Sequence, residues 1–167
     1  GAAGAIAGTA GKDGAAGAGA VGLDVLASSA PRPLAEVVAG ARAVLAGRGI
    51  ALETGGLELL EADAVPPGVR RQLVRVLGEL ASNMASHAAP GSARIAVESD
   101  GRALRALAAN AVRSVAPEAG GAGDPAIAGL GLTGARRRVE SLGGAFEVRR
   151  ARGRWTVVLS VPLRAAP

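Results

Sequence analysis

The chain has 167 residues, enough for one domain with a substantial hydrophobic core and an additional tail. It contains no cysteine and one histidine, which excludes disulfide frameworks, thiolate metal sites and multi-histidine metal centres. A Ser-His-Asp triad would have to use His87 itself. The formal net charge is +5, and Phe146 and Trp155 are the only aromatic residues. Base-stacking platforms for nucleic acid are therefore essentially excluded.

The basic charge is spread along the chain, with local arginine clusters at 136–138 and 149–154. Such a balance is compatible with binding phosphates, nucleic acid or acidic partners, but the favoured interpretation is that these arginines lie on solvated faces. No apolar run reaches the roughly 18 residues that a membrane span needs. The first residues also lack the charged-then-apolar plan of a signal peptide. We therefore expect no direct membrane contact and a cytoplasmic protein, or the cytoplasmic part of a larger one.

The amino-terminal stretch, residues 1–30, consists mostly of glycine and alanine. Glycine costs about 1 kcal/mol per helical position relative to alanine, so this stretch is a poor helix by itself. We predict a tail, or the frayed end of a helix whose partner is missing. Pro31 and Pro33 mark the boundary with the domain proper, residues 31–167.

The domain is predicted to begin with a helix over 34–45, because its apolar residues follow helical spacing and Gly47 supplies a stop signal. Residues 50–54 alternate in hydrophobicity and favour a strand. Residues 55–69 then form a connection that contains Pro66-Pro67 and leads into the next helix.

The central element is a predicted helix over 70–88. Its apolar face recurs at three- and four-residue steps through Leu73, Leu77, Leu80 and Met84. Glu79, Asn83 and His87 recur every four residues and form a polar stripe beside that face. Such a stripe either faces solvent, which is the commoner case, or lines a pocket at the edge of the core.

The sequence after this helix predicts an antiparallel hairpin. Pro90-Gly91 predicts a turn after the helix, and 94–99 and 102–112 predict two strands. They are joined by Asp100-Gly101, a strong two-residue hairpin signal. Asn110 stands near the end of the second strand, where the chain leaves the sheet.

The rest of the domain contains a long connection, a helix and a second hairpin. Residues 113–128 are rich in Gly, Pro and Ala, and a connection of this length in a compact domain is usually functional or mobile. Residues 129–134 lead into a predicted helix over 135–142, which ends at two glycines. Strands are predicted over 145–150 and 155–161. The side chains that alternate inward on the last strand are Trp155, Val157, Leu159 and Val161.

The glycines of the segment Gly129–Gly134 have a physical use at a helix start. Without a Cβ in the way, backbone N–H groups can approach a ligand, and the helix dipole favours an anion such as phosphate. The alternative is simply a flexible loop that enters a helix. The segment is neither a dinucleotide-binding fingerprint nor a P-loop, because it does not follow a strand directly and lacks the Lys-Ser/Thr ending.

The combination of these pieces is more specific than any of them alone. The order is E-x-x-x-N-x-x-x-H on a helix, a hairpin ending at Asn110, a Gly-rich connection, then G-x-G-L-x-G-x-R-x-R-V-x-x-L-G-G. Over residues 34–163 this resembles the ATP-binding catalytic domain of bacterial two-component sensor histidine kinases, in the GHKL ATPase family. It is most similar to the branch that is paired with helix-turn-helix response regulators. The resemblance implies the Bergerat ATP-binding fold, an α/β (α+β) two-layer sandwich whose mixed, mostly antiparallel sheet is covered by helices on one face.

The resemblance also implies roles for individual residues. Asn83 would bind the Mg²⁺ that bridges the ATP phosphates, and Glu79 would be the catalytic residue that orients or deprotonates the attacking group or a metal-bound water. His87 would lie near the phosphates, and Asn110 would accept a hydrogen bond from the adenine amino group. The glycine box with backbone amides facing ATP would include Gly129, Gly131, Leu132 and Gly134. Residues 113–128 would be the ATP lid.

Two positions depart from the family pattern. Asn110 stands where the family usually has an aspartate, and its carbonyl oxygen can still accept a hydrogen bond, but without a charge. Trp155 is bulky where the family often has a small Gly-Thr pair, and Thr156 follows it. These changes bear on adenine affinity more than on the fold.

The resemblance implies ATP and Mg²⁺ as cofactors and a kinase that acts on a histidine of a separate dimerisation domain. His87 is not placed as that phosphoacceptor. One interpretation of the Gly/Ala-rich tail, residues 1–30, is the remnant of a dimerisation helix. The implied partners are that phosphoacceptor domain, a cognate response regulator and a second copy in a full-length homodimer, but no nucleic acid. Two alternatives stay open: a degenerate relative that binds a protein partner without ATP turnover, and a basic nucleic-acid-binding module.

Overall fold

The computed structural model describes residues 31–112 and 132–163. The predicted tail, the predicted lid at 113–128, and Gly129 and Gly131 lie outside these ranges. The elements in chain order are α2 (Leu34–Ala46), β1 (Ile50–Gly55), the 3₁₀ helix η1 (Leu57–Glu61), α3 (Pro67–His87), β2 (Ala88–Ser99), β3 (Ala103–Val112), α5 (Leu132–Ser141), β4 (Ala145–Ala151) and β5 (Arg154–Pro162). In the described residues no helix is both long and apolar enough to cross a membrane.

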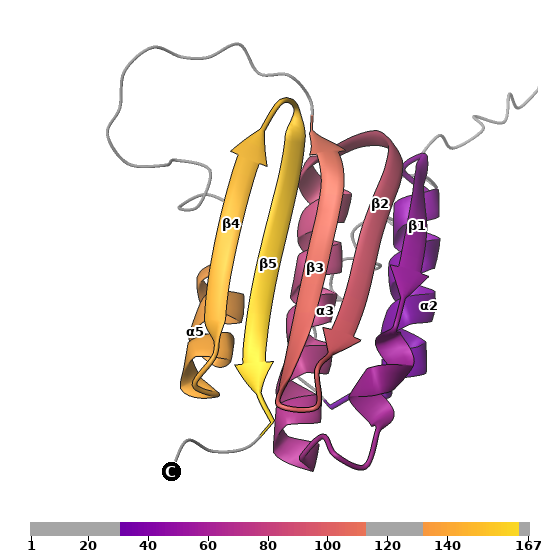
Figure 1. Cartoon of the computed structure of the whole chain (residues 1–167). Helices are drawn as coiled ribbons and strands as arrows, with labels where there is room; N and C mark the ends of the chain where they lie inside the picture. The colour runs from indigo at the N-terminus through magenta and orange to yellow at the C-terminus, as the bar shows by residue number, and fades with distance from the viewer. Residues whose placement is uncertain (1–30, 113–131, 164–167) are drawn as a thin grey trace, which may run out of the picture.

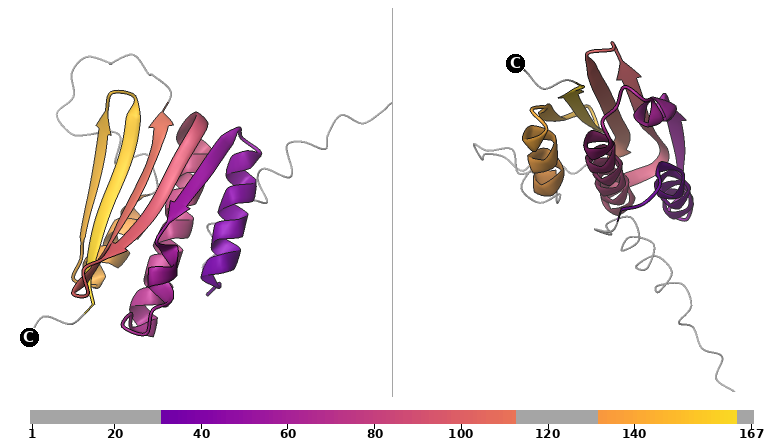
Figure 2. Two further views of the ribbon diagram at one scale, coloured as in Figure 1. Left: turned by 45° about the vertical axis from the view of Figure 1, so that its right-hand side comes forward. Right: turned by 90° about the horizontal axis from the view of Figure 1, so that it is seen from below.

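The strands form one five-stranded sheet in the order β1-β2-β3-β5-β4 (Figure 1). β1 pairs with β2 in parallel, and the other three pairings are antiparallel. The helices α2, α3 and α5 lie side by side on one face of this sheet (Figure 2). The predicted α/β (α+β) two-layer sandwich, with a mixed and mostly antiparallel sheet, is therefore confirmed.

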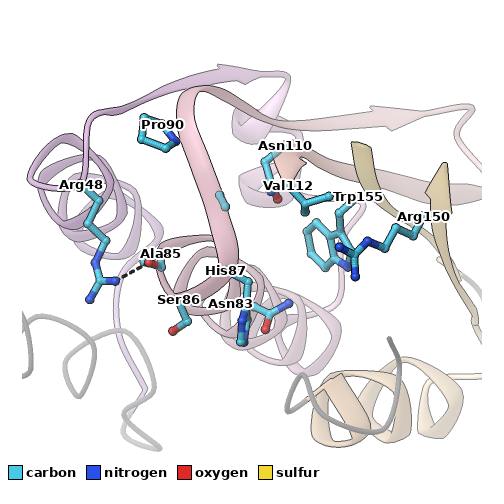
Figure 3. Close-up of a pocket in the computed structure, with 11 residues that line it drawn as sticks. Arg48, Asn83, Ala85, Ser86, His87, Pro90, Asn110, Val112, Arg150 and Trp155 are labelled. Atoms are coloured by element: carbon cyan, nitrogen blue, oxygen red, sulfur yellow. Dashed lines mark hydrogen bonds between the residues drawn. The ribbon is translucent and has the colours of Figure 1, made fainter. Parts of the chain in front are cut away.

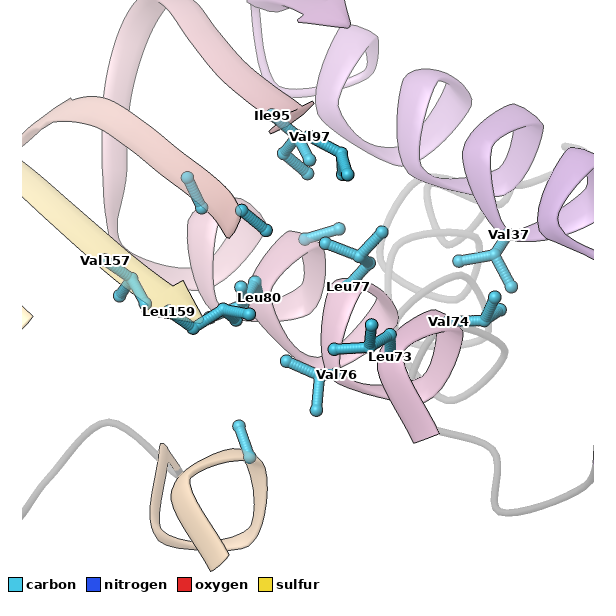
Figure 4. Packing of buried hydrophobic residues seen from close by; sticks show 14 of the residues in the cluster. Val37, Leu73, Val74, Val76, Leu77, Leu80, Ile95, Val97, Val157 and Leu159 are labelled. Carbon is cyan, nitrogen blue, oxygen red and sulfur yellow. The ribbon is translucent and has the colours of Figure 1, made fainter. Parts of the chain in front are cut away.

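The core lies between the sheet and the helix layer, and α3 is its centre. Figure 4 shows Leu77 and Leu80 on the face of α3 that meets the sheet, with Val157 and Leu159 of β5 beside Leu80 and with Ile95 and Val97 of β2 across from Leu77. The inward alternation predicted for β5 is confirmed, because its four inward residues are at most 3% exposed and are Trp155, Val157, Leu159 and Val161. Burial of these apolar side chains supplies most of the free energy that holds α3 in place.

The turn predicted at Pro90-Gly91 is wrong, because β2 starts at Ala88, directly after α3. Gly91 pairs with Ile50 in the parallel ladder, and its N–H donates to the carbonyl oxygen of Gly49 over 2.9 Å. This partner from β1 keeps the chain extended, and Gly91 tolerates its φ of 137° because it has no Cβ. Helix and strand therefore meet at His87 without a loop.

Two helix starts and one connection also differ from the prediction. α3 starts at Pro67, since proline fits the first helical position, where its missing N–H is not needed. α5 starts at Leu132, so Gly134 lies inside its first turn. The connection over 55–69 contains the helix η1, which burial of Leu60 ties to the core.

Gly144, between α5 and β4, is predicted to be essential for packing. A Cβ there would overlap the carbonyl oxygen of Ser160 and lie 2.9 Å from Cγ1 of Val139. Gly144→Ala should lower the free energy of unfolding by about 1–3 kcal/mol, as overpacking does. Urea denaturation followed by circular dichroism measures this change.

Gly68→Ala is the matched control, because no atom lies within 4 Å of its added Cβ and the residue is in α3. It should be neutral or stabilising by up to about 1 kcal/mol. Equal stability of the two variants would contradict the packing at Gly144.

Candidate functional site

A cavity of about 670 Å³ opens where α3 ends and β2 begins (Figure 3). Its remaining walls come from the ends of β3, β4 and β5 and from the turn after α2. The lining residues are Arg48, Asn83, Ala85, Ser86, His87, Ala88, Pro90, Asn110, Val112, Arg150 and Trp155. The direct passage from α3 into β2 thus brings helix side chains and strand side chains to one site.

The polar stripe of α3 contributes two of its three residues to this cavity. Asn83 is 8% exposed and lines the cavity from the last two turns of α3, and His87 lines it as the exposed last residue of the helix. The pocket interpretation of the stripe therefore holds for these two positions. Glu79, the third, is not among the lining residues.

Asn110 and Trp155 stand opposite each other on β3 and β5 and are only 2% and 3% exposed. The Asn110 amide donates from Nδ2 to the carbonyl oxygen of Ala111 over 2.7 Å, which leaves its Oδ1 facing elsewhere. That Oδ1 and the indole Nε1 of Trp155 are both buried without a hydrogen-bond partner. Buried polar atoms are nearly always paired in native proteins, so two orphans at one cavity indicate a missing ligand or water.

The charged groups of the cavity wall are basic. Arg48 and Arg150 line it, and in the described part of the chain no aspartate or glutamate does. Arg48 is fixed by a 2.6 Å hydrogen bond from its Nη1 to the carbonyl oxygen of Ala85 (Figure 3). A wall with cations and without carboxylates favours an anionic ligand.

Glu79 instead joins α3 to α5. Arg138 donates to its Oε1 from Nε over 3.0 Å and from Nη2 over 2.9 Å, and Arg75 lies 3.5 Å from the same oxygen. The other oxygen, Oε2, is buried without a partner. It would lie 3.4 Å from a Cβ added at Gly134, so an alanine there would make van der Waals contact with the carboxylate.

The glycine box is only partly described. Leu132 is 1% exposed and packs into the core at the start of α5, and Gly134 lies over Glu79, so neither lines the cavity. Gly129 and Gly131 lie outside the described residues. Thr156 is adjacent to Trp155 on β5 and therefore points to the other face of the sheet, away from the cavity.

Sequence reasoning missed Arg48 and Arg150 as cavity residues and treated Trp155 only as a departure. The pairing of β5 with both β3 and β4 brings Trp155 opposite Asn110 and Arg150. The sequence predicts the alternation of buried and exposed side chains on the last strand. It does not predict the register between β3 and β5, which pairs residues 45 positions apart in the chain. Nothing in the sequence around Arg48 predicts a cavity residue, apart from its position directly after the predicted end of a helix.

The fold is shared with solved histidine kinases. The blue-light activated histidine kinase of Erythrobacter litoralis EL346 superposes with a TM-score of 0.61 at 20% identity over 78% of this chain. A histidine kinase of Burkholderia phymatum STM815 superposes with a TM-score of 0.57 at 22% sequence identity. The match covers 86% of this chain and 75% of that chain. The catalytic domain of the histidine kinase ThkA superposes with a TM-score of 0.57 at 20% sequence identity. The match covers 77% of this chain and 88% of that domain. The chain has the fold of histidine kinase catalytic domains.

The likeness to these proteins is one of fold, at sequence identities of 20–22%. The chain spans only 40% of the length of the Erythrobacter protein. No protein-family model matches the chain, and no curated protein matches it.

The ion pair between Arg138 and Glu79 should contribute to stability, because both side chains are mostly buried, at 24% and 18% exposed. Arg138→Ala should lower the free energy of unfolding by about 1.5–3 kcal/mol, the usual range for hydrogen bonds to charged groups. Arg149→Ala is the control: its pair with Glu147 is exposed and should contribute nothing measurable. Similar unfolding midpoints in urea for Arg138→Ala and the wild type would contradict this contribution.

Proposed function

We propose that this chain is the Mg-ATP-binding catalytic domain of a two-component sensor histidine kinase of the GHKL family. The observation that carries the proposal is the cavity itself. It combines cations, a buried amide from α3 and a buried unpaired acceptor from β3, within a fold shared with histidine kinase catalytic domains. ATP has a polyanionic end and a base with an amino donor, and these two ends match the two kinds of group in the wall.

The base would bind at Asn110. Because Nδ2 of this residue already donates to the carbonyl oxygen of Ala111, its Oδ1 is held as an acceptor for the adenine amino group. The neutral amide offers a weaker bond than the carboxylate usual in the family. It remains a sufficient partner, since an unpaired buried acceptor gains from any donor that reaches it.

The phosphates would bind near the end of α3. Asn83 is the residue that would hold Mg²⁺, and an amide oxygen is a suitable hard ligand, with waters and phosphate oxygens completing the shell. Bound Mg²⁺ would neutralise charge that develops on the transferred phosphoryl group. His87 and Arg48 add positive or hydrogen-bonding groups to the same wall. Gly129 and Gly131 are proposed to add backbone N–H groups.

Glu79 is the proposed catalytic carboxylate, one helical turn before Asn83. Arg138 and Arg75 hold its Oε1, and its Oε2 is left without a partner. It does not line the cavity, so we propose that it acts from the edge of the site, on the attacking group or a metal-bound water. Arg138, on α5, would then couple the position of this carboxylate to the helix that follows the proposed lid.

The proposed reaction transfers the γ-phosphate of ATP to a histidine on a separate dimerisation domain of a homodimeric kinase, which then serves a cognate response regulator. A degenerate domain that binds a protein partner without turnover is the second candidate, favoured by the unusual Trp155 in the cavity wall. A nucleic-acid-binding module is disfavoured. Arginines of both local clusters are engaged within the chain, Arg136 over the Phe146 ring and Arg149 with Glu147.

Asn83→Ala should abolish the Mg²⁺ dependence of ATP binding. Calorimetric titration with a non-hydrolysable ATP analogue should show binding by the wild type that requires Mg²⁺. The variant should bind about 10- to 100-fold more weakly, the range expected for loss of a contact to a charged group. Ser82→Ala is the control, since it is the preceding residue of α3 and does not line the cavity. No binding by folded wild type would favour the degenerate, partner-binding candidate.

The isolated chain should bind ATP without phosphorylating itself. Its one histidine, His87, lies in the wall of the proposed ATP site rather than on a separate dimerisation domain. After incubation with γ-labelled Mg-ATP, acid-labile and base-stable label on the protein should be absent. A stable phosphohistidine, lost in His87→Gln, would contradict the assignment of His87.

A further inference from the structure

The proposed phosphate site is divided between two helices. Asn83 lies on α3, whereas Leu132 and Gly134 of the glycine box belong to the first turn of α5. α5 is a ten-residue helix at one side of the helix layer, and in the described part of the chain α3 is the one helix beside it (Figure 2). A ligand that contacts both parts of the site therefore depends on how α5 is held against α3.

Among the described residues, the contact between Glu79 and Arg138 is the one ion pair that joins two helices. Nε and Nη2 of Arg138 both donate to Oε1 of Glu79, over 3.0 Å and 2.9 Å. Two donors of one planar guanidinium fix its direction as well as its distance. Neither residue lines the cavity, so the pair reaches a ligand there through the helices that it joins.

The pair lies against the first turn of α5. A Cβ added at Gly134 would be 3.4 Å from Oε2 of Glu79 and 3.8 Å from Nη2 of Arg138. The dipole of α5 strengthens this attachment, because a carboxylate is favourable near the N-terminus of a helix. On α3, Glu79 precedes Asn83 by four residues, about 6 Å along the helix axis. The carboxylate is therefore close to both parts of the proposed phosphate site.

We infer that Arg138 is a positioning residue for the phosphates of ATP. Its pair with Glu79 holds the first turn of α5 at the distance from Asn83 that the phosphate chain requires. This inference rests on the proposed function and adds the interaction that keeps its two helices together. It assigns Glu79 a part in binding that a carboxylate serving only as a base would not have.

Arg75 provides a matched comparison within the same cluster. Its Nε lies 3.5 Å from the same oxygen of Glu79, but Arg75 belongs to α3, so this ion pair joins no second helix. Loss of Arg75 and loss of Arg138 each remove one positive charge from beside Glu79. A difference between the two variants therefore reports the link between helices rather than the charge.

Arg138→Met tests this link, because it keeps an unbranched apolar side chain and removes the guanidinium. The variant should bind a Mg²⁺-loaded, non-hydrolysable ATP analogue about 3- to 30-fold more weakly in calorimetric titration, as loss of a coupled contact predicts. Its affinity for adenosine, measured by ligand-detected NMR, should be unchanged, because adenosine has no phosphate. Arg75→Met should change either affinity by no more than about twofold, since its ion pair is partly exposed.

Glu79→Gln is the second variant, and it decides the question if Arg138→Met does not fold. It removes the charge that holds Arg138 and should show the same selective loss for the ATP analogue. The double variant should bind the analogue no more weakly than the weaker single variant, because the two residues act as one unit.

Unchanged affinity for the ATP analogue in folded Arg138→Met or folded Glu79→Gln would overturn the inference and leave the proposed function intact. An equal loss for adenosine would do the same, because a general disturbance of the fold would then account for the effect. An equal loss in Arg75→Met would overturn it too, since charge alone would explain the result. Absence of ATP-analogue binding by folded wild type would overturn both the inference and the proposed function.

Discussion

The rotation of α3 about its own axis is the constraint on which the candidate site depends. Leu80 and Met84 are each 1% exposed and hold one face of the helix against the sheet. With that face buried, Asn83 and His87 are directed to the cavity at the helix end. A rotation by one residue, about 100°, would expose Leu80 and Met84 and turn the Asn83 amide away from the cavity. The lost burial would cost several kcal/mol. Hydrophobic packing thus fixes the polar geometry.

The second constraint is the absence of a loop between α3 and β2. β2 starts at Ala88, directly after α3, its parallel ladder with β1 starts at Gly91, and the cavity lies beside this junction. Strands β3 and β5 complete the wall with side chains that their antiparallel register places opposite each other. The site is therefore built from local helix periodicity on one side and long-range strand pairing on the other.

This division explains how much could be predicted from the sequence. The three helices, the polar stripe of α3 and the hairpin at Asp100-Gly101 follow from periodicity and turn residues within short windows. The fold class follows from the resemblance to a known family. The continuation of β2 through Pro90-Gly91 depends on a distant partner strand, which local turn propensity cannot report. The same is true of Trp155 opposite Asn110 and of Arg138 on Glu79. Contacts between elements far apart in sequence decided each of these.

The account is tested most directly by a crystal structure of the chain with Mg²⁺ and a non-hydrolysable ATP analogue. It predicts the adenine amino group at Oδ1 of Asn110 and the phosphates with Mg²⁺ at Asn83, at the end of α3. A nucleotide bound elsewhere on the chain, or well-ordered crystals at saturating nucleotide with this cavity filled only by water, would contradict it.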